Sequence, residues 1–244
     1  MKNFSRACLA MLALSAAVPA TAFAQDDASS DGITISGEAT IVSDYRFRGF
    51  SQNGEEFAIQ GGFTVSHDSG LYVGTWGSSI DFGGPGNVEL DAFIGYSTEV
   101  SSGITADIGL NAYFYPGISD STILEPYASL SGDLGPAALT VGAAWAPGGQ
   151  NALSDYSAIY IYSDVGVAIP ETPLTLKGHV GYAKSDSGLG GLDGDVVDYS
   201  IGVDFSYKAL TFGVSYINTD VSNRLFKESV GADGAIVFSL GASF

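Results

Sequence analysis

The sequence predicts an all-β fold, a transmembrane up-and-down antiparallel β-barrel of about twelve strands behind a cleaved N-terminal signal peptide. Three observations predict it: an apolar export segment, strict two-residue alternation in blocks of about ten residues, and connections that alternate between short and long. Charged residues make up 15% of the chain and the formal net charge is −18. Hydrophobic residues make up 45%, too many for a disordered acidic tail, and the scarcity of Lys and Arg argues against nucleic-acid binding.

The first 24 residues have the pattern of a secretory signal. Lys2 and Arg6 precede an almost purely apolar stretch over residues 7–20, and Ala22-Phe23-Ala24 follows as a small-residue cleavage site. We expect cleavage after Ala24. Cleavage would remove the only cysteine, Cys8, and leave 220 residues with a formal charge of −20 and no disulfide.

We therefore expect three parts: a signal peptide over residues 1–24, a short periplasmic segment over 25–32, and a barrel over 33–244 in the bacterial outer membrane. A membrane-spanning helix is excluded. The longest uncharged run after the signal, between Asp133 and Asp155, contains two prolines and a Gly-Gly pair that would break such a helix.

Two-residue alternation places apolar residues on one face of a strand and small or polar residues on the other. Eight segments show it clearly, namely residues 33–41, 57–66, 88–97, 104–114, 174–182, 198–207, 210–216 and 236–244. Weaker segments at 71–80, 124–132, 137–145 and 156–167 bring the total to twelve. In two of the weaker segments the apolar face is ambiguous, because Tyr72, Trp76, Tyr160 and Tyr162 fit either assignment.

The connections support closure into a barrel with one end in the periplasm and the other outside. Short turns are expected at 67–70, 99–103, 132–136 and 207–209, with a slightly longer one at 170–173, and long loops at 47–56, 146–155, 184–196 and 218–233. Aromatic residues end many segments and would form girdles at the lipid interfaces: Tyr45, Tyr96, Tyr115, Trp145, Tyr182, Tyr199, Tyr207 and Tyr216.

Three blocks of the sequence resemble a known family. SDYRFRGFSQ at 43–52 resembles the first-strand motif of the TorF family of porin-like proteins, and YVGTWGSSIDF at 72–82 and ELDAFIGY at 89–96 are similar to its next two blocks. The resemblance implies an outer-membrane β-barrel across the whole mature chain, with a channel as one function. The resemblance therefore implies a location and a fold, and it says little about which solute would pass.

Charged residues on the polar face are the candidates for lining the lumen. They are Glu38, Asp44, Arg46, Arg48, Glu89, Asp91, Asp107, Lys177, His179, Asp198 and Asp204. Two interpretations remain open: the arginines pair with acidic residues such as Glu89 and Asp91 and brace the wall, or they meet a passing solute. Both can hold at once.

The inward-facing positions are rich in small residues, which favours a narrow water-filled passage. They are Gly62, Ser66, Gly95, Ser97, Gly109, Gly202, Ser206, Gly213, Ser215, Gly241 and Ser243. A loop folded inward, from 47–56 or from 218–233, would close that passage. The terminal Phe244, with apolar residues at alternate positions before it, is expected to be a signal for the barrel-assembly machinery.

The functional hypothesis is passive diffusion of ions or small polar solutes, with cation preference from the acidic excess. The expected partners are outer-membrane lipid, lipopolysaccharide, the assembly machinery and the solutes themselves, with no cofactor and no nucleic acid. The alternative is a closed barrel with a structural or surface-binding role through its long loops. An enzyme is the third class, for which a serine would have to reach His67 or His179.

Overall fold

The structure is a computed structural model that describes residues 32–84 and 86–244. The expected signal peptide, its cleavage site after Ala24 and the first residues of the expected periplasmic segment lie outside the described residues.

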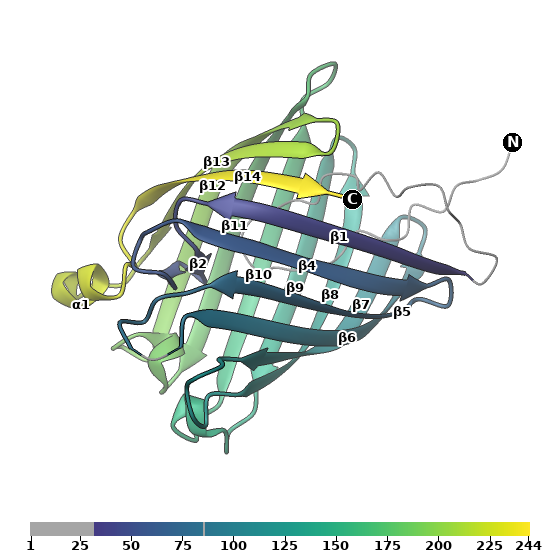
Figure 1. Cartoon of the computed structure of the whole chain (residues 1–244). Coiled ribbons are helices and arrows are strands. Elements are labelled where there is room, and N and C mark those ends of the chain that lie inside the picture. Colours follow the sequence, from purple (N-terminus) through teal and green to yellow (C-terminus); the bar gives the residue numbers. More distant parts are fainter. Residues whose placement is uncertain (1–31, 85) are drawn as a thin grey trace, which may run out of the picture.

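Twelve strands form one closed antiparallel barrel (Figure 1). They are β1 (Ile33–Val42), β4 (Ala58–His67), β5 (Leu71–Ser79), β6 (Val88–Ser101), β7 (Ile104–Phe114), β8 (Ile123–Leu134), β9 (Ala137–Ala146), β10 (Ala158–Ala168), β11 (Leu174–Ser185), β12 (Asp195–Tyr207), β13 (Leu210–Thr219) and β14 (Ala235–Ser243). All twelve predicted segments are strands, and consecutive barrel strands are paired. The prediction of an up-and-down barrel is confirmed.

The barrel closes where the first strand meets the last. β1 pairs antiparallel with β14 from Glu38↔Ser243 to Val42↔Ser239. Two further backbone hydrogen bonds extend this seam, from Gly37 N to Phe244 O at 2.7 Å and from Phe244 N to Gly37 O at 3.0 Å. Closure leaves the sheet with no free edge. A free edge would be costly in lipid, because its backbone N–H and C=O groups would have no hydrogen-bond partners.

Short turns gather at one end of the barrel and long loops at the other. The turns and the C-terminus lie on the right in Figure 1, whereas the long loops and α1 (Arg224–Ser229) lie on the left. Two 3-10 turns, η1 (Asn151–Leu153) and η2 (Gly188–Gly190), also belong to the long loops. No helix in the described part of the chain is long and apolar enough to span a membrane.

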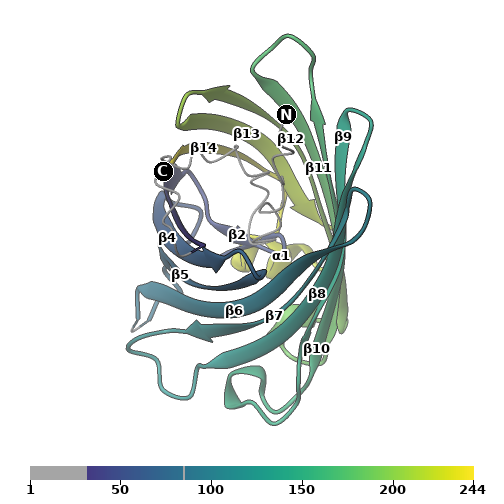
Figure 2. The ribbon, with the colours of Figure 1, turned by 90° about the vertical axis from the view of Figure 1, so that its right-hand side faces the viewer.

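One small element does not belong to the wall. β2 (Arg46–Phe47) and β3 (Phe50–Ser51) pair with each other as a hairpin between β1 and β4. Figure 2 views the barrel from the end that carries the short turns. In this view the strands form a ring, and β2 lies inside it. We call residues 43–57 the inner loop. The segment 47–56 was expected as a long external loop that could fold inward, and it does fold inward.

The alternation is confirmed in every clear segment, with large apolar side chains outside. Ile35 and Ile201 are each 68% exposed on the outer face, whereas Glu89 and Asp107 are each 2% exposed inside. The structure also resolves the ambiguous faces, because Tyr72, Trp76, Tyr160 and Tyr162 all point inward. The predicted girdle position of Tyr45 is wrong, since the inner loop carries this side chain into the core.

Inward-facing aromatic rings lie over glycines of the neighbouring strand. Tyr72 pairs with Gly95, and a Cβ at Gly95 would lie 2.1 Å from the tyrosine oxygen. Tyr127 covers Gly109 in the same way, and Tyr162 covers Gly142. The missing side chains let the rings lie along the wall. Part of the space that the sequence assigned to the passage is therefore filled by tyrosine.

A charge placed on the outer face tests this assignment. Leu130 of β8 is 48% exposed on the outside, and Leu130→Arg should lower the free energy of unfolding by about 2–4 kcal/mol in lipid vesicles. Ser129→Arg is the matched control, because Ser129 faces the lumen opposite Asp107 and should cost less. Denaturant titration of the refolded barrels checks both, and equal losses would contradict the assignment.

Candidate functional site

The inner loop begins with a tight turn that the sequence encodes locally. Phe47 and Phe50 pair across a two-residue turn, and its central residues Arg48 and Gly49 have φ of +50° and +86°. Positive φ at both positions is what a type I′ hairpin requires. Space also selects glycine, because a Cβ at Gly49 would lie 2.4 Å from a methyl group of Thr219.

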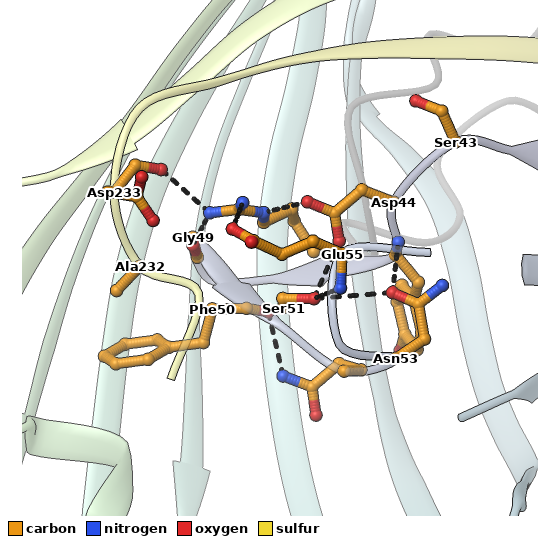
Figure 3. A network of polar contacts seen from close by, with 12 residues as sticks. Ser43, Asp44, Gly49, Phe50, Ser51, Asn53, Glu55, Ala232 and Asp233 are labelled. Carbon is orange, nitrogen blue, oxygen red and sulfur yellow. Dashed lines mark hydrogen bonds and ion pairs between the residues drawn. The ribbon is translucent and has the colours of Figure 1, made fainter. Parts of the chain in front are cut away.

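Arg46 holds the inner loop together from within, and Figure 3 shows its partners Asp44, Glu55 and Asp233 close to one another. Its Nε donates to Asp44 at 2.5 Å and its Nη2 to Glu55 at 3.0 Å, and its side chain is 1% exposed. Its Nη1 donates to the carbonyl oxygens of Gly49 and Asp233. The last bond ties the inner loop to the long loop between β13 and β14, which we call the C-terminal loop (residues 220–234).

Arg48 reaches across the barrel to the opposite wall. Its Nη2 lies 2.8 Å from both carboxylate oxygens of Glu125 on β8, and both side chains are buried. The guanidinium also lies 4.1 Å from the ring centre of Tyr160 on β10. Arg48 therefore braces two parts of the wall. The arginines do pair with acidic residues and brace the wall, as one of the two interpretations held, but their partners are Asp44, Glu55 and Glu125 instead of the suggested Glu89 and Asp91.

Tyr45 fixes the other side of the inner loop. Its side chain is buried, with 1% of the residue exposed. Its ring packs edge-on against Trp76 with 5.5 Å between the ring centres, and its hydroxyl donates to Glu89 at 3.3 Å. Its backbone N–H donates to Asn53, which closes the loop on itself. The inner loop is thus packed into the lumen by aromatic contacts on one side and by an ion pair on the other.

His179 is the centre of a second polar cluster on the lumen face. Its Nδ1 lies 2.6 Å from Asp164 and its Nε2 lies 3.0 Å from Asp198. Each ring nitrogen therefore faces a carboxylate oxygen, and a protonated imidazole donates to both. Tyr160 completes the cluster, with its hydroxyl donating to Asp198 and stacking its ring on that of His179.

Three further predicted residues have partners elsewhere in the lumen. Lys177 forms an ion pair with Asp204 at 2.9 Å. Asp107 accepts from the hydroxyl of Tyr72 at 2.7 Å, and that hydroxyl also meets the hydroxyl of Tyr127.

The remaining predicted residues are placed as follows. Glu38 faces the lumen from β1 and is exposed there. Asp91 is buried on β6, and neither of its carboxylate oxygens has a partner in the described part of the chain. The ring of Phe244 lies against Gly37 of β1 at the seam. Its role in assembly stays a prediction.

Sequence reasoning missed several residues of the site. The most important are Glu125, Tyr45, Glu55, Asn53, Asp164 and Asp233. Glu125 could have been found, because Leu124, Ala128 and Leu130 share one face of its strand and leave Glu125 on the other. The other residues either belong to the inner loop and its contacts or bond a residue on another strand. Alternation along a single strand does not predict such partners.

One serine does reach a histidine. Ser69 Oγ lies 2.8 Å from Nδ1 of His67, but the same nitrogen accepts the backbone N–H of Ser69 at 3.0 Å in an exposed turn. In the described residues no acid or amide orients the other ring nitrogen, as a catalytic triad requires. His179 bonds carboxylates and a tyrosine instead of a serine. Nor do the described residues contain three or more His, Cys, Asp or Glu side chains placed to hold a metal.

Comparisons with solved structures define the class. The NanC porin is similar with a TM-score of 0.58 and 13% identity over 86% of this chain and 99% of that one. The KdgM porin is similar with a TM-score of 0.59 and 7% identity over 86% and 98%. At such identity the likeness concerns the fold alone. The chain therefore has the closed antiparallel β-barrel fold of these small porins.

The family follows from the sequence itself. Residues 25–244 match the family described as "Bacterial protein of unknown function (Gcw_chp)", and the chain belongs to this family. Among curated proteins, none matches the sequence.

Removing the guanidinium of Arg48 should loosen the inner loop. Arg48→Met leaves the Glu125 carboxylate buried with only the hydroxyl of Tyr113, which should cost about 3 kcal/mol. We expect faster amide hydrogen exchange over residues 44–53, measured by mass spectrometry in detergent micelles. Arg48→Met/Glu125→Gln should recover part of the loss, because it removes the stranded charge.

The matched control is Arg224→Met. Arg224 forms an ion pair with Glu228 on the surface of α1, so its loss should leave the inner loop unchanged. Unaltered exchange in Arg48→Met would show that the ion pair does not hold the loop.

Proposed function

We propose that this protein is a narrow outer-membrane channel for ions or small polar solutes, with preference for cations, and that the inner loop forms its constriction. The carrying observation is the charge on the lumen face. Carboxylates there are Glu38, Asp44, Glu89, Asp91, Asp107, Glu125, Asp164, Asp198 and Asp204, and they outnumber the cationic side chains Arg46, Arg48, Lys177 and His179. Lumen charge of one sign favours the opposite ion.

The two ends of the lumen differ, which supports a constriction at the loop end. Toward the turn end, inward positions carry small hydroxyl residues such as Ser66, Ser206 and Ser243, all partly exposed. Toward the loop end, Trp76 and Tyr113 of the wall are buried, and so are Tyr45, Arg46 and Asn53 of the inner loop. A wide vestibule would thus lead to one narrow region.

A closed barrel with a structural or surface-binding role is the second candidate. The burial of the inner loop favours it, because Tyr45, Arg46 and Asn53 are packed against the wall and the C-terminal loop. A barrel that stays shut needs such a plug. We prefer the channel because the plug is held mainly by ion pairs and hydrogen bonds, which water and ions can replace.

Two finer points belong to the same proposal. The resemblance of residues 43–52 to the TorF family agrees with a porin-like role. We also propose that the protein has no catalytic activity, because among residues 32–84 and 86–244 no acid orients the pair of His67 and Ser69. Lipid, lipopolysaccharide and the assembly machinery are the proposed partners of the outer face and of the seam at Phe244.

Planar-bilayer recordings of the refolded protein test the function. We expect discrete conductance steps. Under a potassium chloride gradient, the sign of the reversal potential should show that potassium passes more readily than chloride. A Gly-Ser linker of equal length in place of residues 45–53 should raise the conductance about twofold or more, because the narrowest segment sets the resistance.

The control variant carries the same kind of linker in place of residues 224–229, which lie in α1 outside the lumen. Its conductance should equal that of the unaltered protein. Silence of the unaltered protein with conduction by the inner-loop variant would favour the closed barrel. Silence of both would overturn the channel, and anion preference would overturn the selectivity.

A further inference from the structure

Asp91 is the one acidic residue of the lumen face that the described structure leaves buried with neither carboxylate oxygen bonded. It is 4% exposed. Glu125, in contrast, binds Arg48 and Tyr113, and Glu89 accepts from Tyr45. An ionised carboxylate buried without a partner is costly, so this position demands a positive charge or a proton.

The strand register surrounds Asp91 with aromatic residues. Trp76 on β5 and Tyr113 on β7 are its direct cross-strand partners, and all three side chains face inward. Direct partners have Cβ atoms about 5 Å apart. From the inner loop, Tyr45 packs on Trp76 and covers this part of the wall.

A second carboxylate shares the site. Glu89 precedes Asp91 by two residues and therefore lies on the same inward face of β6. No arginine, lysine or histidine forms an ion pair with Glu89 or Asp91 among the described residues, because Arg46 and Arg48 are engaged elsewhere. Two carboxylates without a counter-charge thus sit among aromatic rings, and both kinds of group attract cations.

We propose that Asp91 and Glu89 bind a monovalent metal cation beneath the inner loop. A divalent ion such as calcium takes six or more oxygen ligands, commonly from several carboxylates. The described residues offer no cluster of three or more His, Cys, Asp and Glu side chains for it. The site deepens the proposed function, on which it rests for access from the lumen: it is where a cation would pause beside the constriction.

Trp76 provides a reporter for the site. The chain has two tryptophans, and Trp145 lies on the outer face, 51% exposed. In a Trp145→Phe background, thallium(I) acetate should quench the fluorescence of Trp76, because thallium(I) resembles potassium in size and quenches indole on contact. We expect saturable quenching that potassium acetate reverses by competition.

Asp91→Asn should weaken this quenching roughly tenfold or more, as expected for loss of a charged ligand. Glu89→Gln should weaken it to a smaller extent and serves if Asp91→Asn does not refold. Asp120→Asn is the matched control, since it removes one carboxylate from an exposed loop and should leave the titration unchanged. Gel migration before and after heating verifies that each barrel is folded.

The outcomes separate this proposal from the channel itself. Linear quenching that neither saturates nor responds to Asp91→Asn would overturn the site. If that happens while the bilayer recordings show cation preference, the channel stands without the site. Saturable binding by a protein that does not conduct would leave the site standing and overturn the channel.

Discussion

The demand that every backbone N–H and C=O find a partner governs this molecule. In lipid no water can satisfy a free strand edge, so β1 must meet β14. Closure around twelve strands then leaves an interior wider than the wall side chains fill on their own. Everything described inside the barrel, from the tyrosines over glycines to the inner loop, is an occupant of that interior.

The interior is filled in two ways with different physical consequences. Aromatic rings over glycines, such as Tyr72 over Gly95, thicken the wall and are fixed by strand register. The inner loop instead crosses the lumen and depends on Arg48 and Glu125, two charges taken out of water that must match each other. The first kind of filling belongs to the wall itself, whereas the second depends on contacts that a loop makes across the lumen.

The sequence was sufficient for the barrel and insufficient for its contents. Alternation with a period of two is local, so all twelve strands and the faces of the clear ones could be predicted from short windows. The alternation left the facing of Tyr72, Trp76, Tyr160 and Tyr162 ambiguous. Large aromatic rings usually mark the outer face, but here they face inward, where glycines make room for them. The partners of the inner loop are far away, with Glu125 lying 77 residues from Arg48, and no window contains both.

The inner loop lies near the start of the chain, yet some of its fastenings lie near the end. Arg46 bonds Asp233 across 187 residues, and Ser43 accepts the backbone N–H of Phe238 across 195. Contacts of such high sequence separation form late in folding. The inner loop therefore gains its last fastenings only after the final strands are in place, so a barrel that is still incomplete during assembly holds this loop by fewer contacts.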